Sequence, residues 1–186
     1  MKKFILIFVF VLGFLFISTK SFAQENSLIS SPSSSSAEII DYQLPYPGLL
    51  PDSPLYFFRA LRDNLSGFLI ADPLKKAEFD LLQSDKRLNA GIYLSDKKKY
   101  DLAESTVSKG ENYLEDSISK MEQAKKQGEL VSDIGKRVYL SSLKQQQVLR
   151  IIADKVSGNL REKFLLDNKR VEELGKRVKK IIPQNN

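Results

Sequence analysis

Three features of the sequence predict an all-α protein: an antiparallel bundle of four long helices plus one short N-terminal amphipathic helix. From Pro54 onward, apolar residues recur at spacings of three and four, and no window shows strict alternation. Gly and Pro fall at the boundaries of these periodic segments. The four longer segments, each of about 23 to 30 residues, are joined by short turns, which favours antiparallel neighbours over one extended coiled coil.

The first 23 residues have the composition of a secretory signal peptide. Two lysines are followed by about fourteen apolar residues from Phe4 to Ile17, and Ser21 and Ala23 are small residues at the spacing of a cleavage site. A membrane span needs about 20 apolar residues, so the shorter run favours cleavage after Ala23 over retention as an anchor. We therefore predict that the chain is exported to a periplasmic or extracellular location.

Residues 24–44 are predicted to form a Ser-rich, disordered linker, and residues 45–186 the helical bundle domain. Seven serines lie between Ser27 and Ser36, and little else in that stretch can be buried. Loss of three lysines with the leader leaves 26 basic and 23 acidic residues, a net charge of +3 in place of the +6 of the whole chain. A charge of this size does not imply binding to nucleic acid.

The short N-terminal helix is expected between Ser53 and Ile70. Ser53 as N-cap and Pro54 at the first helical position form a start signal, because proline lacks an N–H that would be unpaired there. Its apolar stripe is broadened by further large side chains; together these residues are Leu55, Tyr56, Phe57, Phe58, Leu61, Leu65, Phe68 and Leu69.

Four longer helices follow, and their ends are marked by local signals. The second helix is expected to begin at Asp72-Pro73, and the third to end at Gly128 after two lysines that suit the last turn. Ser132 is the expected N-cap of the fourth helix, and Asn159 with Glu162 resembles a capping box for the fifth. A tetratricopeptide repeat is the weaker interpretation, because no second copy occurs at a period of 34 residues.

The segment from Tyr46 to Leu88 contains several motifs in a distinctive order. Leu-Pro-Asp-Ser-Pro-Leu-Tyr occupies residues 50–56, a second Asp-Pro lies at residues 72–73, and charged residues continue to Lys86-Arg87. In this order the segment resembles a family of exported bacterial helical domains, domain of unknown function family 5667. The resemblance implies an extracytoplasmic helical domain, and it brings no activity, ligand or catalytic residue.

The start of the short helix is a candidate interaction surface, made of Leu55, Tyr56, Phe57 and Phe58. Two interpretations are open. In one, the helix is a folding device that caps the bundle and buries its aromatic side chains. In the other it is a docking surface, on which Tyr56 or Phe57 stays exposed and meets a partner or lipid headgroups, because so broad an apolar helix can exceed what four helices cover.

Basic residues gather in the last helix. Residues 161–180 include eight basic and four acidic side chains, and Lys169, Arg170, Lys179 and Lys180 have the weakest local compensation. One hypothesis is loose contact with an anionic membrane or wall surface. The alternative is an ordinary solvated helix end whose cations suit the helix dipole.

The residue types of the chain exclude several kinds of active site. Without Cys and His the chain cannot build a disulfide, a thiolate or imidazole metal site, a cysteine nucleophile or a His-dependent triad. The sequence has no Asp/Asn-rich loop of the kind that is typical of a calcium site. It also has no pair of carboxylates at a spacing that would bring them together as in a hydrolase. We therefore expect no enzymatic activity, no catalytic residue, no cofactor and no metal.

Polar residues interrupt two of the predicted core stripes, Gln145 in the fourth helix and Asn168 in the fifth. Either they form a buried hydrogen-bonded layer that sets the register of the helices, or the stripes rotate and both side chains face water.

The function predicted from these features is that of a non-enzymatic structural or protein-interaction module at the bacterial cell envelope. Its partner would be an unknown envelope protein. The alternative is peripheral binding to anionic membrane or wall surfaces through the basic C-terminal helix, and an undiscovered carboxylate hydrolase is a more distant third. Nucleic acid is not an expected partner, since the sequence has no aromatic and basic groove.

Overall fold

The computed structural model describes residues 40–182, which belong to one compact unit. The predicted signal peptide and the linker up to residue 39 lie outside the described residues. Within the described range all regular secondary structure is helical, which confirms the predicted fold class. The helices are α2 (Tyr56–Phe68), α3 (Pro73–Asp96), α4 (Tyr100–Lys126), α5 (Ser132–Ala153) and α6 (Gly158–Ile181).

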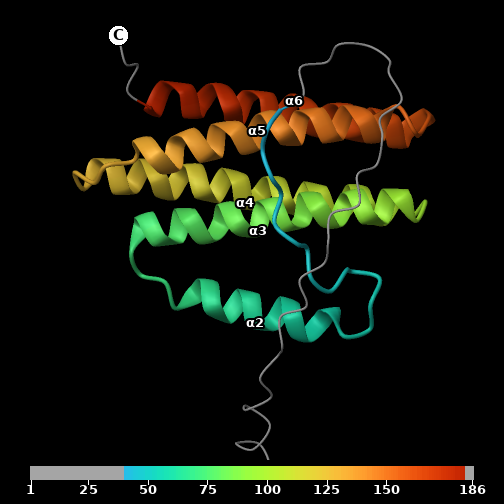
Figure 1. Cartoon of the computed structure of the whole chain (residues 1–186), viewed down its shortest axis with the longest axis horizontal. Helices are drawn as coiled ribbons and strands as arrows, with labels where there is room; N and C mark the ends of the chain where they lie inside the picture. Colours follow the sequence, from blue (N-terminus) through green and yellow to red (C-terminus); the bar gives the residue numbers. More distant parts are fainter. Residues whose placement is uncertain (1–39, 183–186) are drawn as a thin grey trace, which may run out of the picture. The chain divides into compact units, whose positions relative to one another are not determined.

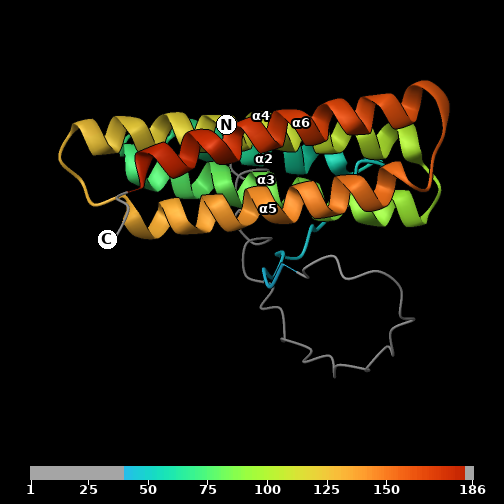
Figure 2. The ribbon, with the colours of Figure 1, turned by 90° about the horizontal axis from the view of Figure 1, so that it is seen from above.

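The four long helices form a bundle of two hairpins. Helix α3 packs along α4, and α5 packs along α6. The hairpins meet through contacts between α4 and α6 and between α3 and α5, with successive helices running in opposite directions (Figures 1 and 2). Short turns therefore produce antiparallel neighbours, as the sequence predicts. Helix α2 packs against α3 on the side away from α5 and α6 (Figure 1).

The core lies between the four long helices and is filled by the stripes of apolar residues predicted from the 3–4 spacing. Burying one such side chain stabilises the fold by about 1.5–3 kcal/mol. The largest fully buried apolar side chains come from every one of these helices and are Leu81, Leu88, Leu94, Leu114, Ile118, Met121, Leu149, Ile152 and Phe164.

Two glycines allow α3 and α4 to lie close together. A Cβ at Gly91 of α3 would come within 2.3 Å of Cγ2 of Val107 on α4. A Cβ at Gly110 of α4 would come within 3.1 Å of the Cβ of Arg87 and 3.2 Å of the carbonyl oxygen of Ser84, both on α3. The contact between these helices therefore depends on the missing side chains.

The predicted helix ends are partly confirmed. The Asp72 side chain accepts a hydrogen bond from the N–H of Lys75 at 2.8 Å, and Gly128 has the left-handed φ of +87° expected after a helix C-terminus. The other three predicted caps are wrong. Helix α2 begins three residues after Ser53, Ser132 is the first helical residue of α5 and not its cap, and α6 begins before Asn159 without a side-chain cap.

Residues 40–54, which we call the strap, cross the outside of α5 and α3 before the chain enters α2. Lys144 of α5 donates to the carbonyl oxygen of Ile40 at 3.3 Å, and Asn89 of α3 donates to that of Pro45 at 2.8 Å. Leu44 packs against the core. Residues 40–44, which the sequence assigns to the disordered linker, thus lie on the bundle, because these few apolar and polar groups find partners there.

Candidate functional site

Helix α2 exposes the side that holds most of its large apolar residues. At 3.6 residues per turn these residues share one side of the helix, and its two buried residues, Asp63 and Gly67, lie on the opposite side. The exposed residues are Leu55, Phe57, Phe58, Leu61, Leu65, Phe68 and Leu69, each more than half exposed. We call these seven residues the α2 apolar face.

Helix α2 is attached to the bundle through its polar side. Gly67 lies against the ring of Phe79 on α3, where a Cβ would come within 2.9 Å of a ring carbon. The hydroxyl of Tyr113 on α4 donates to Oδ1 of Asn64 at 3.4 Å. An amphipathic helix normally turns its apolar side toward the core. In α2 this orientation is reversed, and the contacts of the polar side maintain it.

The four residues of the candidate interaction surface predicted from the sequence lie on two different sides of α2. Leu55, Phe57 and Phe58 lie on the α2 apolar face, with Phe57 67% exposed, whereas Tyr56 is half-buried on another side of the helix. The folding-device interpretation does not account for these exposed side chains. The rest of the face, which extends to Phe68 and Leu69, was not among the candidates, although its residues continue the same 3–4 spacing.

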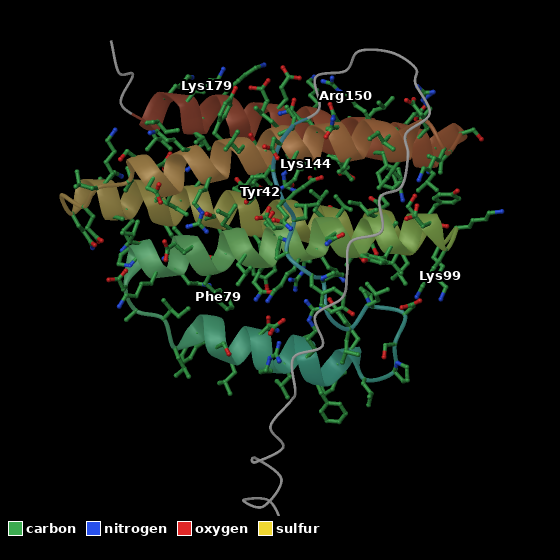
Figure 3. The ribbon with its side chains drawn as sticks, viewed as in Figure 1. Tyr42, Phe79, Lys99, Lys144, Arg150 and Lys179 are labelled. Atoms are coloured by element: carbon green, nitrogen blue, oxygen red, sulfur yellow. The ribbon has the colours of Figure 1, made fainter. Side chains whose placement is uncertain are left out.

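The Leu-Pro-Asp-Ser-Pro-Leu-Tyr segment fixes the start of α2 by an ion pair and not by capping. Asp52 accepts hydrogen bonds from Lys99 at 2.9 Å and Lys97 at 3.0 Å, at the turn between α3 and α4. These hydrogen bonds lower the pKa of Asp52. Lys99 is labelled at this turn in Figure 3. The Asp52 carboxylate therefore ties the segment before α2 to the turn between α3 and α4.

A hollow of about 560 Å³ adjoins the N-terminal end of α2. Arg59 donates to the carbonyl oxygen of Leu49 in its wall, and Gly48 takes a φ of +71° beside the Arg59 guanidinium. Lys86 makes no hydrogen bond or ion pair within the described range. Among the described residues, no acidic side chain lines the hollow; its wall contains Tyr46, Leu49, Leu55, Phe58, Arg59, Arg62 and Lys86.

Of the four cations proposed to contact anionic surfaces, two are engaged within the bundle. Arg170 donates to Glu115 at 2.7 Å, and Nζ of Lys179 lies 4.8 Å from the centre of an aromatic ring on α5. Lys169 and Lys180 are exposed and make no hydrogen bond or ion pair with described residues. Other cations of α6 pair with carboxylates. The structure therefore does not bring the four together as one continuous basic face.

A buried polar layer links the strap, α3 and α5. Asp85 accepts hydrogen bonds from the hydroxyls of Tyr42 and Ser141, each at 2.5 Å, and Gln145 donates to Ser84 at 3.0 Å. Burial raises the pKa of Asp85, although the two hydroxyl donors oppose the rise. Burial and the neighbouring Asp85 also raise the pKa of Tyr42, which is labelled in Figure 3. Sequence reasoning found Gln145 in this layer and missed its other members.

Asn168 is also buried, but it belongs to a different contact. Its amide donates to the carbonyl oxygen of Gln146 at 2.8 Å, which joins α6 to α5. Gln145 instead joins α5 to α3. The interpretation that both side chains face water is wrong, and a role of the two residues in setting helix register stays a prediction.

Removal of one hydroxyl tests the polar layer. We expect Tyr42→Phe to lower the free energy of unfolding by about 1–2 kcal/mol, because a buried oxygen of Asp85 loses its donor. Urea denaturation measures this loss, and amide exchange should become faster in residues 40–45. Tyr46→Phe is the matched control, since Tyr46 lies on the same strap and is 77% exposed. Equal stability of the two variants would contradict the prediction.

Two carboxyl groups with raised pKa values lie where α4 meets α6. Burial and the charge of Asp167 raise the pKa of Glu111 to about 8, and burial and the charge of Glu104 raise that of Asp167 to about 6. Arg170 stands 3.6 Å from Glu111, and the Glu111 oxygens accept no hydrogen bond from described residues. Separated pKa values suit acid–base catalysis. Glu111, however, is fully buried.

Within residues 40–182, no group of three or more acidic side chains could hold a metal ion. None of the helices α2 to α6 is both long enough and apolar enough to cross a bilayer.

Neither the curated proteins nor the solved structures include a significant match to this chain. A family described as "Domain of unknown function (DUF5667)" matches residues 48–159. The matched residues begin in the strap, include α2 to α5 and end at the start of α6. Because the match extends over more than half of the chain, the protein belongs to this family of domains of unknown function.

Proposed function

We propose that this protein is an exported, non-enzymatic helical module of the bacterial cell envelope, and that it docks onto another envelope component through the α2 apolar face. Export rests on the signal-peptide composition of residues 1–23. The absence of catalysis rests on the lack of Cys and His and on the complete burial of Glu111.

The α2 apolar face is the observation that supports docking most directly. Soluble monomers rarely expose contiguous apolar patches of more than a few hundred Å². Seven large apolar side chains side by side on one short helix approach or exceed that size. The polar side of the helix is meanwhile held on α3 and α4 by Gly67 and Asn64. A helix that is held in place with its apolar side outward has the arrangement expected of a contact surface.

Docking through the basic C-terminal helix has less support. Arg170 and Lys179 are occupied by partners on other helices, and four of the eight cations of α6, Arg161, Arg170, Lys176 and Arg177, pair with carboxylates. Surface charges that are already paired contribute little to the attraction of a distant anionic surface. We therefore place the contact on α2.

Expression of the full-length chain in a bacterium tests this proposal. We expect an exported product that begins at Gln24, identified by intact mass, and its recovery with the envelope fraction. Phe57→Ser with Phe68→Ser should lower the envelope-bound fraction at least tenfold, because each exposed phenyl ring contributes about 1.5–3 kcal/mol when it is buried.

The matched control replaces two exposed leucines elsewhere, Leu130 and Leu166, which are 89% and 66% exposed. Leu130→Ser with Leu166→Ser should leave the distribution unchanged. A chain that stays in the cytosol with its leader attached would contradict export. Equal envelope binding of the two double variants would contradict docking through α2.

A further inference from the structure

We infer that the α2 apolar face and the hollow beside it bind the surface of a bilayer that contains anionic phospholipid. This inference rests on the proposed function and names the partner of the same surface. Three observations support it: the shape of α2, the charges around the hollow, and the position of Arg62 on the helix.

The shape of α2 suits a helix that lies in the plane of a membrane surface. Its 13 residues give a length of about 20 Å, with the apolar side chains on one side only. Interfacial helices bury such a side about 5–10 Å deep, at the boundary of headgroups and acyl chains. Tyr46 and Leu49 of the strap, both exposed, extend the apolar surface beyond the start of the helix. The polar side of an interfacial helix normally faces water, and in this protein the polar side of α2 faces the bundle instead.

The hollow adds two cations, Lys86 and Arg62, at the edge of this apolar surface. Lys86 has no hydrogen-bond or ion-pair partner among residues 40–182. Arg62 pairs with the adjacent, buried Asp63, yet 69% of its side chain is exposed. Arg59 stands in the same wall, but its side chain is only 11% exposed, pairs with Asp63 at 3.5 Å and donates to the carbonyl oxygen of Leu49. Lys86 and Arg62 are therefore the cations that can meet a ligand there. A lipid phosphate, which lies next to acyl chains, is the anion that matches cations placed beside apolar groups.

A second copy of the chain fits this surface less well. Arg62 is the middle residue of α2 and borders the apolar face, because Phe58 lies one turn before it and Leu65 one turn after it. Two α2 helices packed antiparallel through their apolar faces would therefore bring two Arg62 guanidinium groups near each other. The carboxylate beside each of them, Asp63, is buried and already paired. A bilayer brings phosphates to the same cations.

Binding to vesicles tests the inference. The probe is the chain from Gln24 onward, which includes every described residue, mixed with vesicles of phosphatidylcholine containing about one third phosphatidylglycerol. We expect co-sedimentation that weakens at least tenfold on pure phosphatidylcholine and as salt is raised, because attraction to anionic lipid is electrostatic.

Two double variants separate the apolar and the charged contributions. Phe57→Ser with Phe68→Ser should abolish binding to both kinds of vesicle. Lys86→Gln with Arg62→Gln should weaken binding to the anionic vesicles roughly 30-fold, the effect of two cations near a charged surface, and leave binding to pure phosphatidylcholine unchanged. Leu166→Ser with Lys180→Gln on α6 is the control and should bind like the original chain. Circular dichroism checks that each variant keeps its helices.

The outcomes distinguish this inference from the proposed function on which it rests. Absence of binding to anionic vesicles, or binding that the α2 variants do not change, overturns the lipid partner. If the chain instead forms a dimer that Phe57→Ser with Phe68→Ser dissociates in analytical ultracentrifugation, the partner is a second copy and docking through α2 stands. If the same variant also keeps its full envelope association in cells, docking through α2 fails as well.

Discussion

Replacement of Glu111 by Gln is expected to make the protein more stable at alkaline pH, by on the order of 4 kcal/mol at pH 9. Glu111 lies fully buried between α4 and α6, without a hydrogen-bond donor among the described residues. Arg170, the nearest cation, is directed toward Glu115, to which it donates at 2.7 Å. The charged form of Glu111 is therefore poorly compensated in the folded protein.

The direction of the pH effect follows from proton uptake. The pKa of Glu111 is about 8 in the folded protein, against an ordinary value of 4.5. Between these values the folded chain holds a proton that the unfolded chain has lost, so the free energy of unfolding falls as the pH rises. The stability that protonated Glu111 contributes is fully present below about pH 4.5. It declines as the pH rises above that value and is gone once the pH has passed through 8. Gln keeps the shape of the side chain and cannot ionise, so this loss should disappear.

Urea denaturation from pH 5 to pH 9 measures the effect. The original chain and Glu111→Gln should differ little at pH 5 and most at pH 9. Asp167→Asn supplies the comparison within the same cluster, because the pKa of Asp167 is raised only to about 6. Its removal should flatten the profile below pH 6 and, because the charge of Asp167 helps to raise the pKa of Glu111, should also end the remaining decline at a lower pH. A Glu111→Gln variant with the same decline in stability between pH 6 and pH 8 as the original chain would contradict the assignment.

Gly91→Ala is expected to destabilise the bundle by about 2–3 kcal/mol, although alanine favours a helix over glycine by about 1 kcal/mol. The added methyl group would lie 2.3 Å from Cγ2 of Val107, and Val107 is fully buried. A β-branched side chain in a packed core cannot rotate away from the methyl group, so α3 and α4 must move apart. Thermal and urea denaturation measure the loss.

A second substitution shows whether crowding is the cause. Val107→Ala alone should destabilise the protein by leaving a cavity. In the Gly91→Ala, Val107→Ala double variant, the methyl group at position 91 occupies part of that cavity. The double variant should then be at least 1 kcal/mol more stable than the sum of the two single effects predicts. Simple additivity would show that the two side chains do not compete for the same space.

Sequence patterns predicted the helices of this protein well because a bundle is built from local signals. The 3–4 spacing in residues 73–181 places apolar groups on one side of each helix, and that side becomes the core. Asp72 with Pro73 and Gly128 mark helix ends through bonds within a few residues. The caps predicted at Ser53, Ser132 and Asn159 were wrong, because a serine or asparagine also occurs in turns and first turns without capping.

The candidate site was only partly visible in the sequence. The aromatic start of α2 was identified, since its large side chains stand out. Its orientation was not, because it depends on the approach of Gly67 to Phe79 and on the bond between Asn64 and Tyr113, which join residues far apart in the chain. The sequence also could not show which of the four candidate cations of α6 are free, because two of them have partners on neighbouring helices.

By itself, the sequence determined that this chain folds as an antiparallel helical bundle, and it excluded every active site that needs Cys or His. Periodicity and composition suffice for both conclusions, because they depend only on residue types and their spacing. The tertiary structure decided which apolar stripe is buried and which is left open, and which carboxyl groups are enclosed. Those outcomes depend on contacts between helices, where one missing Cβ or one distant donor determines which side of a helix meets its neighbour.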